Sequence, residues 1–220
     1  MKKIIPNAIT SANLFCGCLA ITQIAEGNFT IASLLVLLGA FFDFFDGLAA
    51  RALKVGSPLG AQLDSLADMV TFGLVPAYLA FELLNNLDYS ILNCSAFLIA
   101  IFSAVRLAKF NIDDRQSTSF IGVPTPANAL FWIGIPHLNL SISIMTLLFI
   151  VALSTFLLNS RIKFIKIGIK KSFLSLSFIA TLIIASLILG LRMGLGAISG
   201  VVVLYVVFST IQTVIIRFRN

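Results

Sequence analysis

The chain has 220 residues, of which 59% are hydrophobic and only 11% are charged, and its formal net charge is +6. Soluble domains are nearer half apolar and a quarter charged, so a mean hydropathy of +1.06 excludes an ordinary soluble fold and indicates a lipid bilayer. The positive charge does not indicate a nucleic-acid partner, because basic residues of membrane proteins gather in cytoplasmic loops beside anionic lipid.

Eight apolar stretches follow one another along the chain, and a helix needs about 20 mostly apolar residues to span a bilayer. We therefore expect an all-α integral membrane protein, a polytopic helical bundle of about eight spans that forms a single domain over residues 1–220. Residues 1–160 would make a six-helix core, and residues 161–220 would add a basic segment and two further helices. The stretches are residues 5–26, 30–53, 58–84, 89–111, 124–138, 140–159, 172–190 and 194–216.

The basic residues predict the orientation of these spans. If both termini are cytoplasmic, 14 of the 15 basic residues fall on the cytoplasmic side and only Arg192 falls on the other. Membrane proteins concentrate lysine and arginine in this way. We therefore expect an even number of spans with both termini in the cytoplasm.

The second and third stretches carry four carboxylates, at positions where ionisable residues are costly and by default signal function. Asp43 and Asp46 are three residues apart, and Asp64 and Asp68 are four apart, so each pair shares one face of its helix. The connection between the stretches, about residues 53–59, is short. The two helices should be antiparallel neighbours, with their acidic faces near the same, cytoplasmic, surface.

Four converging carboxylates cannot all stay ionised without a compensating charge. Oxygen ligands without histidine or cysteine suit Mg²⁺ or Mn²⁺, and two such ions about 4 Å apart can clamp the attacking and leaving oxygens of a phosphoryl displacement. Asp43, Asp46, Asp64 and Asp68 are the candidate ligands. Two alternatives remain, namely buried carboxylates satisfied by protein partners and a cation transporter, although a transport path would need polar residues at several depths.

Two glycines and an arginine flank these acids. Gly47 and Gly60 remove side-chain bulk where a phosphate or nucleotide could approach the helix backbone. Arg51, one turn after Gly47, is suited to contact a diphosphate through charge-assisted hydrogen bonds.

At these positions the sequence resembles the CDP-alcohol phosphatidyltransferase family, whose signature is D-x2-D-G-x2-A-R-x8-G-x3-D-x3-D. The resemblance implies an enzyme that uses Mg²⁺ or Mn²⁺, two ions in all, to transfer a phosphatidyl group from a CDP-activated lipid to an alcohol. It further implies that Asp43, Asp46 and Asp64 bind metal, and that Asp68 is the general base with a metal contact of its own. All fixed positions match: Asp43, Asp46, Gly47, Ala50, Arg51, Gly60, Asp64 and Asp68.

The same resemblance implies a site for the CDP moiety. Residues 6–10 resemble the family's N-terminal P-N-x-x-T element, although asparagine and threonine after a proline are also typical of a helix start. Ser57 matches a hydroxyl position that often helps to hold the nucleotide. The expected contacts to the CDP-lipid are Asn7, Thr10, Gly47, Ala50, Arg51, Ser57 and Gly60.

Residues 106–111 and 120–129 resemble segments of those family members that use L-serine. The serine carboxylate needs a cation, for which Arg106 and Lys109 are candidates, and Asn111 could bind the ammonium or carboxylate group. Position 109 holds Lys where Arg is common, which keeps the charge and loses the fork geometry. The alternative for these residues is an ordinary basic helix terminus.

The resemblance therefore implies CDP-diacylglycerol and L-serine as substrates, in a prokaryotic inner membrane with the active site facing the cytoplasm. Glycerol phosphate or inositol phosphate as acceptor, and an ether-lipid donor, remain alternatives, because the shared motif is the same for all of them. Family members are often dimers, so a homodimer is also expected.

Overall fold

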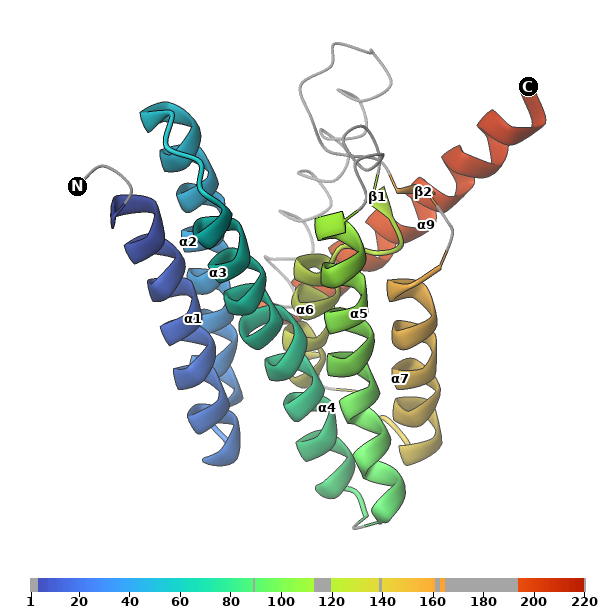
Figure 1. Cartoon of the computed structure of the whole chain (residues 1–220). Coiled ribbons are helices and arrows are strands. Elements are labelled where there is room, and N and C mark those ends of the chain that lie inside the picture. The colour runs from blue at the N-terminus through green and yellow to red at the C-terminus, as the bar shows by residue number, and fades with distance from the viewer. Residues whose placement is uncertain are drawn as a thin grey trace.

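A computed structural model gives the arrangement of the chain (Figure 1). It describes residues 4–88, 90–112, 120–138, 140–160, 163–164 and 194–219. The helical elements are α1 (Ile4–Ala25), α2 (Phe29–Leu53), α3 (Pro58–Asp68), the π-helical segment η1 (Met69–Leu74), α4 (Val75–Asn85), the 3-10 helix η2 (Ile91–Phe97), α5 (Leu98–Ile112), α6 (Thr125–Gly134), the 3-10 turn η4 (Ile135–His137), α7 (Ile144–Leu158), the 3-10 turn η5 (Gly194–Gly196) and α9 (Ala197–Arg219). Two short strands, β1 (Phe120–Ile121) and β2 (Lys163–Phe164), pair antiparallel.

Four continuous helical segments are long and apolar enough to cross a membrane, namely Ile4–Ala25, Phe29–Leu53, Pro58–Asn85 and Ile91–Ile112. The predicted helical membrane architecture is thus confirmed, whereas the number of eight spans stays a prediction. The expected fifth stretch forms only the short α6 and η4, and the sixth forms the 15-residue α7. The expected stretch at residues 172–190, and the basic segment before it apart from β2, lie outside the described residues.

The membrane-facing surface and the interior of the bundle are both apolar. One core cluster joins α1, α2, η1, α4 and α6, and a second joins α4, η2, α5, α6 and α7. Large side chains such as Phe41 and Phe44 are more than half exposed, at 54% and 61%. Exposed phenylalanines of this size are suited to contact lipid, and they leave the polar faces of α2 and α3 to pack inward.

The turn between α2 and α3 makes these helices antiparallel neighbours, as predicted (Figure 1). Lys54 ends α2 in a left-handed conformation, with φ of 53°, and its backbone N–H donates to the last carbonyls of the helix. Ser57 then begins α3, because its Oγ accepts a hydrogen bond from the Gly60 N–H at 3.0 Å and Pro58 occupies the first turn. The short turn brings the acidic faces of α2 and α3 together.

Thr71 in η1 lies where α1, α2 and η1 meet. A Cβ atom added at Gly17 would lie 2.5 Å from the Thr71 Oγ1, and one added at Gly39 would lie 2.8 Å from its Cγ2. The Thr71 hydroxyl donates to the backbone carbonyl of Asn13 at 3.0 Å. The two glycines therefore let three helical segments approach closely, directly after Asp68.

Candidate active site

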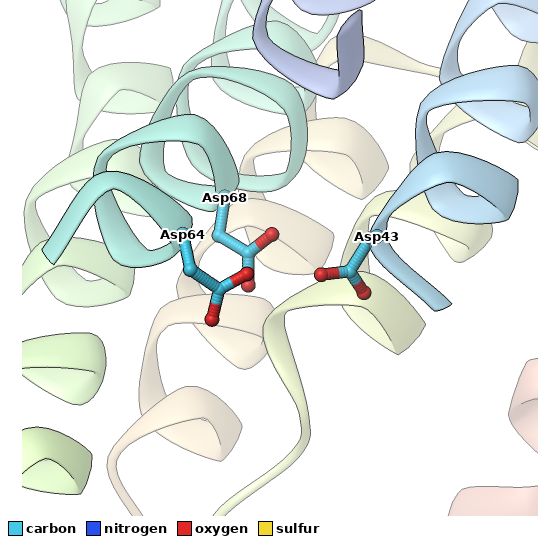
Figure 2. A group of neighbouring side chains, drawn as sticks. All are labelled: Asp43, Asp64 and Asp68. Atoms are coloured by element: carbon cyan, nitrogen blue, oxygen red, sulfur yellow. The ribbon is translucent and has the colours of Figure 1, made fainter. Parts of the chain in front are cut away.

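Three carboxylates meet between α2 and α3. One oxygen atom from each of Asp43, Asp64 and Asp68 lies within 4.8 Å of the other two. Figure 2 shows the three side chains pointing toward one another, Asp43 from α2 and the other two from α3. All three are partly buried, so water screens their mutual repulsion less than it would at an open surface. Such a set of oxygen atoms suits a hard divalent cation.

Asp46, the fourth predicted ligand, lies outside this group of three. Its side chain is only 6% exposed, and its Oδ2 accepts a 2.6 Å hydrogen bond from the hydroxyl of Thr10 on α1. The structure therefore separates the two aspartates of α2: Asp43 faces α3, and Asp46 contacts α1.

A cavity of about 210 Å³ opens between α1, α2 and the start of α3. Six of the seven residues predicted to contact the CDP-lipid line this cavity. A Cβ atom added at Gly47 would have its nearest neighbour, an Arg51 guanidinium nitrogen, at 3.9 Å, so there is free space beside this glycine. We call this space the first cavity. Its lining is Pro6, Asn7, Thr10, Asp46, Gly47, Ala50, Val55, Gly56, Ser57, Gly60, Ala61 and Asp64.

Arg51 is the predicted CDP contact that does not line the first cavity. Its side chain is exposed, and its Nε donates to the carbonyl of Gly47 at 3.0 Å. The guanidinium thus lies back along its own helix, and its predicted contact with a diphosphate stays a prediction.

A second cavity, of about 190 Å³, lies on the other side of the carboxylates, between α3, α5 and the start of α6. Asp64 lines both cavities, and Asp68 lines only the second. The acids therefore lie between two separate spaces, each large enough to hold part of a substrate. The lining of the second cavity is Asp64, Ser65, Asp68, Arg106, Leu107, Phe110, Asn111, Pro124, Thr125 and Pro126.

Arg106 and Asn111 line the second cavity, whereas Lys109 does not. The Lys109 ammonium instead donates to Asn159 Oδ1 at 3.1 Å. Arg106 is 7% exposed, and one of its terminal nitrogens lies 3.5 Å from the hydroxyl of Thr125. The cavity wall therefore contains a buried guanidinium near the Asp68 carboxylate, with which it interacts electrostatically.

Three side chains at this site, Ser65, Thr125 and Tyr205, were not predicted from the sequence. Ser65 exchanges hydrogen bonds of 2.8 and 3.2 Å with the predicted Asn111, and these bonds join α3 to the end of α5. Thr125 contacts Arg106, and it lies within the segment 120–129 that was singled out for its family resemblance. Tyr205 of α9 is 8% exposed and interacts electrostatically with Arg106, and no motif in the sequence marks it.

The sequence model of the CDP-alcohol phosphatidyltransferase family matches residues 3–212, which is nearly the whole chain. The CDP-diacylglycerol–serine O-phosphatidyltransferase of Bacillus subtilis (strain 168) is 44% identical over 123 residues, covering 56% of this chain and 69% of the relative.

Enzymes of the same name from two other organisms are also similar. The Helicobacter pylori (strain ATCC 700392 / 26695) protein is 36% identical over 127 residues, 57% of this chain and 54% of the relative. The Methanocaldococcus jannaschii protein is 38% identical over 130 residues, 59% of each chain. The chain thus matches a little over half the length of these two relatives.

Proposed function

This chain belongs to the CDP-alcohol phosphatidyltransferase family, and we propose that it transfers the phosphatidyl group of CDP-diacylglycerol to the hydroxyl of L-serine. The products are phosphatidylserine and CMP. The observation that carries this proposal is the pair of cavities on either side of the Asp43, Asp64 and Asp68 cluster, which share Asp64 as a wall. The whole of residues 1–220 would form one catalytic domain.

The first cavity receives the CDP part of the donor. Its free space beside Gly47 suits a nucleotide that approaches the helix backbone, and Asn7 and Thr10 bring polar side chains to its α1 wall. Ser57 and Gly60 lie on the α3 wall. Arg51 lies one turn from Gly47, and a change of its side-chain rotamer would turn the guanidinium toward the diphosphate.

The second cavity receives serine. Its buried Arg106, on α5, offers the positive charge that the serine carboxylate requires, and Asp68, on α3, lines the same cavity. Asn111 lines this cavity, and its second amide hydrogen or oxygen lone pair, beyond the bonds to Ser65, would bind the ammonium or carboxylate group. Lys109 does not line the cavity and contributes only to the local potential, because it is bound to Asn159. Phosphorylated acceptors would need more cations, which favours serine over glycerol phosphate or inositol phosphate.

Divalent metal completes the site. Asp43, Asp64 and Asp68 would hold Mg²⁺ or Mn²⁺, with Asp46 beside them as the further ligand of a two-ion centre. Bound there, the ions would stabilise negative charge on the diphosphate. The residues present fit this role, because all four supply carboxylate oxygen, which both metals prefer.

The reaction is a single displacement at phosphorus. Asp68 takes the proton of the serine hydroxyl, and the freed oxygen forms a bond to the phosphorus next to the glycerol. The bond from that phosphorus to the bridging oxygen of CMP breaks, and CMP leaves with the electron pair. Arg51 stabilises the charge that develops on the diphosphate.

The placement of the enzyme is part of the proposal. Both termini and the acids would face the cytoplasm of a prokaryotic inner membrane, where serine and CMP exchange with water. The distribution of basic residues supports this orientation. CDP-diacylglycerol would enter laterally from the inner leaflet, and two copies of the chain would form a homodimer.

The test is release of CMP by the purified protein with CDP-diacylglycerol, Mn²⁺ or Mg²⁺, and one acceptor at a time. Serine should be the acceptor that supports turnover, and an ether-lipid donor forms a parallel arm. Asp68→Asn and Asp64→Ala should abolish transfer while the protein stays folded, and Asp88→Asn, an exposed acid after α4, is the control. Wild-type turnover in both site variants, or turnover with another acceptor alone, would contradict the assignment.

A further inference from the structure

Asn13 of α1 is completely buried and contacts the proposed general base. Its side chain is 0% exposed, and its Nδ2 donates to Oδ1 of Asp68 at 3.3 Å. Its own Oδ1 has no hydrogen-bond partner among the residues that the structure describes. A buried amide oxygen without a partner costs about 1–3 kcal/mol. An apolar residue of the same shape would avoid that cost, so stability alone does not favour asparagine here.

The same segment that carries Asp68 also fixes the backbone of Asn13. Thr71, three residues after Asp68, donates from its hydroxyl to the Asn13 carbonyl at 3.0 Å. Gly39 of α2 leaves room for the amide, since a Cβ atom there would lie 2.9 Å from the Asn13 Oδ1. Thr71 therefore fixes the backbone of Asn13, Gly39 leaves space for its amide, and the amide donor lies toward the carboxylate.

We propose that Asn13 is a positioning residue for Asp68, an inference that rests on the proposed function. An ionised carboxylate only accepts hydrogen bonds, so the amide N–H holds Oδ1 and leaves Oδ2 to take the serine proton. The donor is neutral, so it orients the carboxylate without adding a positive charge that would compete with a divalent cation. Asn13 lines neither cavity, so it would touch neither substrate.

The decisive variant is Asn13→Leu, which keeps the shape of the side chain and removes the donor. Asn93 supplies the matched control, because it is also 0% exposed, and its Oδ1 is also without a partner among the described residues. Its Nδ2 donates to Oδ1 of Asn85, the last residue of α4, and to the carbonyl of Asp88 just after it, away from the clustered acids. Asn93→Leu therefore measures the effect of losing a buried amide far from the reaction.

Groups that orient ligands of a metal site typically change activity or metal affinity by about 10–100-fold when they are removed. We expect Asn13→Leu to lower kcat by roughly this factor and to leave the KM for CDP-diacylglycerol little changed. The Mn²⁺ concentration for half-saturation, measured without substrates from the EPR signal of the free ion, should rise in Asn13→Leu and stay unchanged in Asn93→Leu.

Two outcomes would overturn the inference. One is wild-type kcat and Mn²⁺ binding in Asn13→Leu, and the other is an equal loss in Asn13→Leu and Asn93→Leu with parallel loss of thermal stability. Failure of the proposed function has a different signature, because the wild-type protein would then not release CMP with serine at all.

Discussion

The hydroxyl of Thr10 lies 2.6 Å from Oδ2 of Asp46, and this contact joins α1 to α2 beside the first cavity. It separates Asp46 from the three carboxylates that meet around Asp43, although Asp43 and Asp46 are only three residues apart. The α2 helix thus presents one acid to α3 and one to α1. The second of these lines the first cavity, so in the proposed two-ion centre it would act on the side of the cluster that faces the CDP-lipid.

Thr10→Val should weaken donor use more than acceptor use. Valine keeps the shape of threonine and removes the hydrogen bond to Asp46, and a hydrogen bond to a charged group contributes about 1.5–3 kcal/mol. We expect the KM for CDP-diacylglycerol to rise by roughly 10-fold or more, with the KM for serine little changed. Thr22→Val is the control, because the Thr22 hydroxyl bonds only within its own helix, to the Leu19 carbonyl.

Arg106→Gln should raise the KM for serine by roughly 10–100-fold, because the charge-assisted contact to the serine carboxylate is lost. Lys109→Gln should have little effect, because that ammonium is bound to Asn159 and does not line the second cavity. Steady-state kinetics over a range of serine concentrations measure both. Equal effects of the two substitutions would contradict the placement of serine beside Arg106.

Gly60→Ala should narrow the first cavity. The added Cβ atom would lie 3.1 Å from Ser57 Oγ and 3.2 Å from Asn7 Oδ1, so both polar side chains would have to move. We expect a higher KM for CDP-diacylglycerol. Gly56→Ala provides the comparison, since Gly56 lines the same cavity and a Cβ atom there meets nothing within 4 Å. A stronger effect at Gly56 would contradict the prediction.

Removal of metal by EDTA should abolish CMP release, and added Mn²⁺ should restore it. Asp43→Ala should raise the Mn²⁺ concentration for half-saturation, because it removes one of three clustered carboxylates. Asp88→Asn, outside the cluster, should leave it unchanged. Titration calorimetry or EPR of the free ion measures the affinity, and an unchanged value in Asp43→Ala would exclude this aspartate as a ligand.

Gly17→Ala should destabilise the bundle, because its Cβ atom would lie 2.5 Å from the Thr71 hydroxyl oxygen and 3.0 Å from the Thr71 Cα. Overpacking of this kind typically costs about 1–3 kcal/mol. The melting temperature of the purified protein in detergent should fall. Cys18→Ala, at the next and exposed position, should leave the melting temperature close to that of the wild type.

Local spacing predicted the geometry around Asp43, Asp64 and Asp68 because helical periodicity and a short turn determine it. Residues four apart on α3 share a face, and the four-residue connection (54–57), at whose end Ser57 caps α3, turns the chain back so that Asp43 of α2 meets that face. Helical spacing and a short turn depend on residues that are close in the sequence, so both can be predicted from it. The membrane character followed equally directly from composition.

Contacts between distant segments could not be predicted in the same way. The partner of Asp46 is 36 residues earlier, and the partner of Lys109 is 50 residues later. Tyr205 reaches Arg106 from α9, a helix for which hydropathy was the sole indication. Spacing within one helix does not specify which of these distant groups a side chain meets.

The π-helical segment η1 is a further feature that hydropathy did not reveal. It interrupts the predicted span of residues 58–84 between Asp68 and α4. Pro76, just after it, has no N–H to donate to the carbonyl four residues earlier, and a local change of helical pitch is one way to accommodate that loss. A continuous apolar stretch therefore concealed a break in regular helix beside the acids.

The shared wall at Asp64 has a practical consequence for inhibition. Since this one side chain borders both cavities, a compound that joins a cytidine diphosphate group to an amino-acid carboxylate through a short bridge would fill both at once. Such a bisubstrate ligand would make contacts in both cavities, yet it would lose the translational and rotational entropy of a single molecule and not of two. It would compete with the lipid donor and with serine alike, and its bridge length would report the distance over which the phosphatidyl group moves.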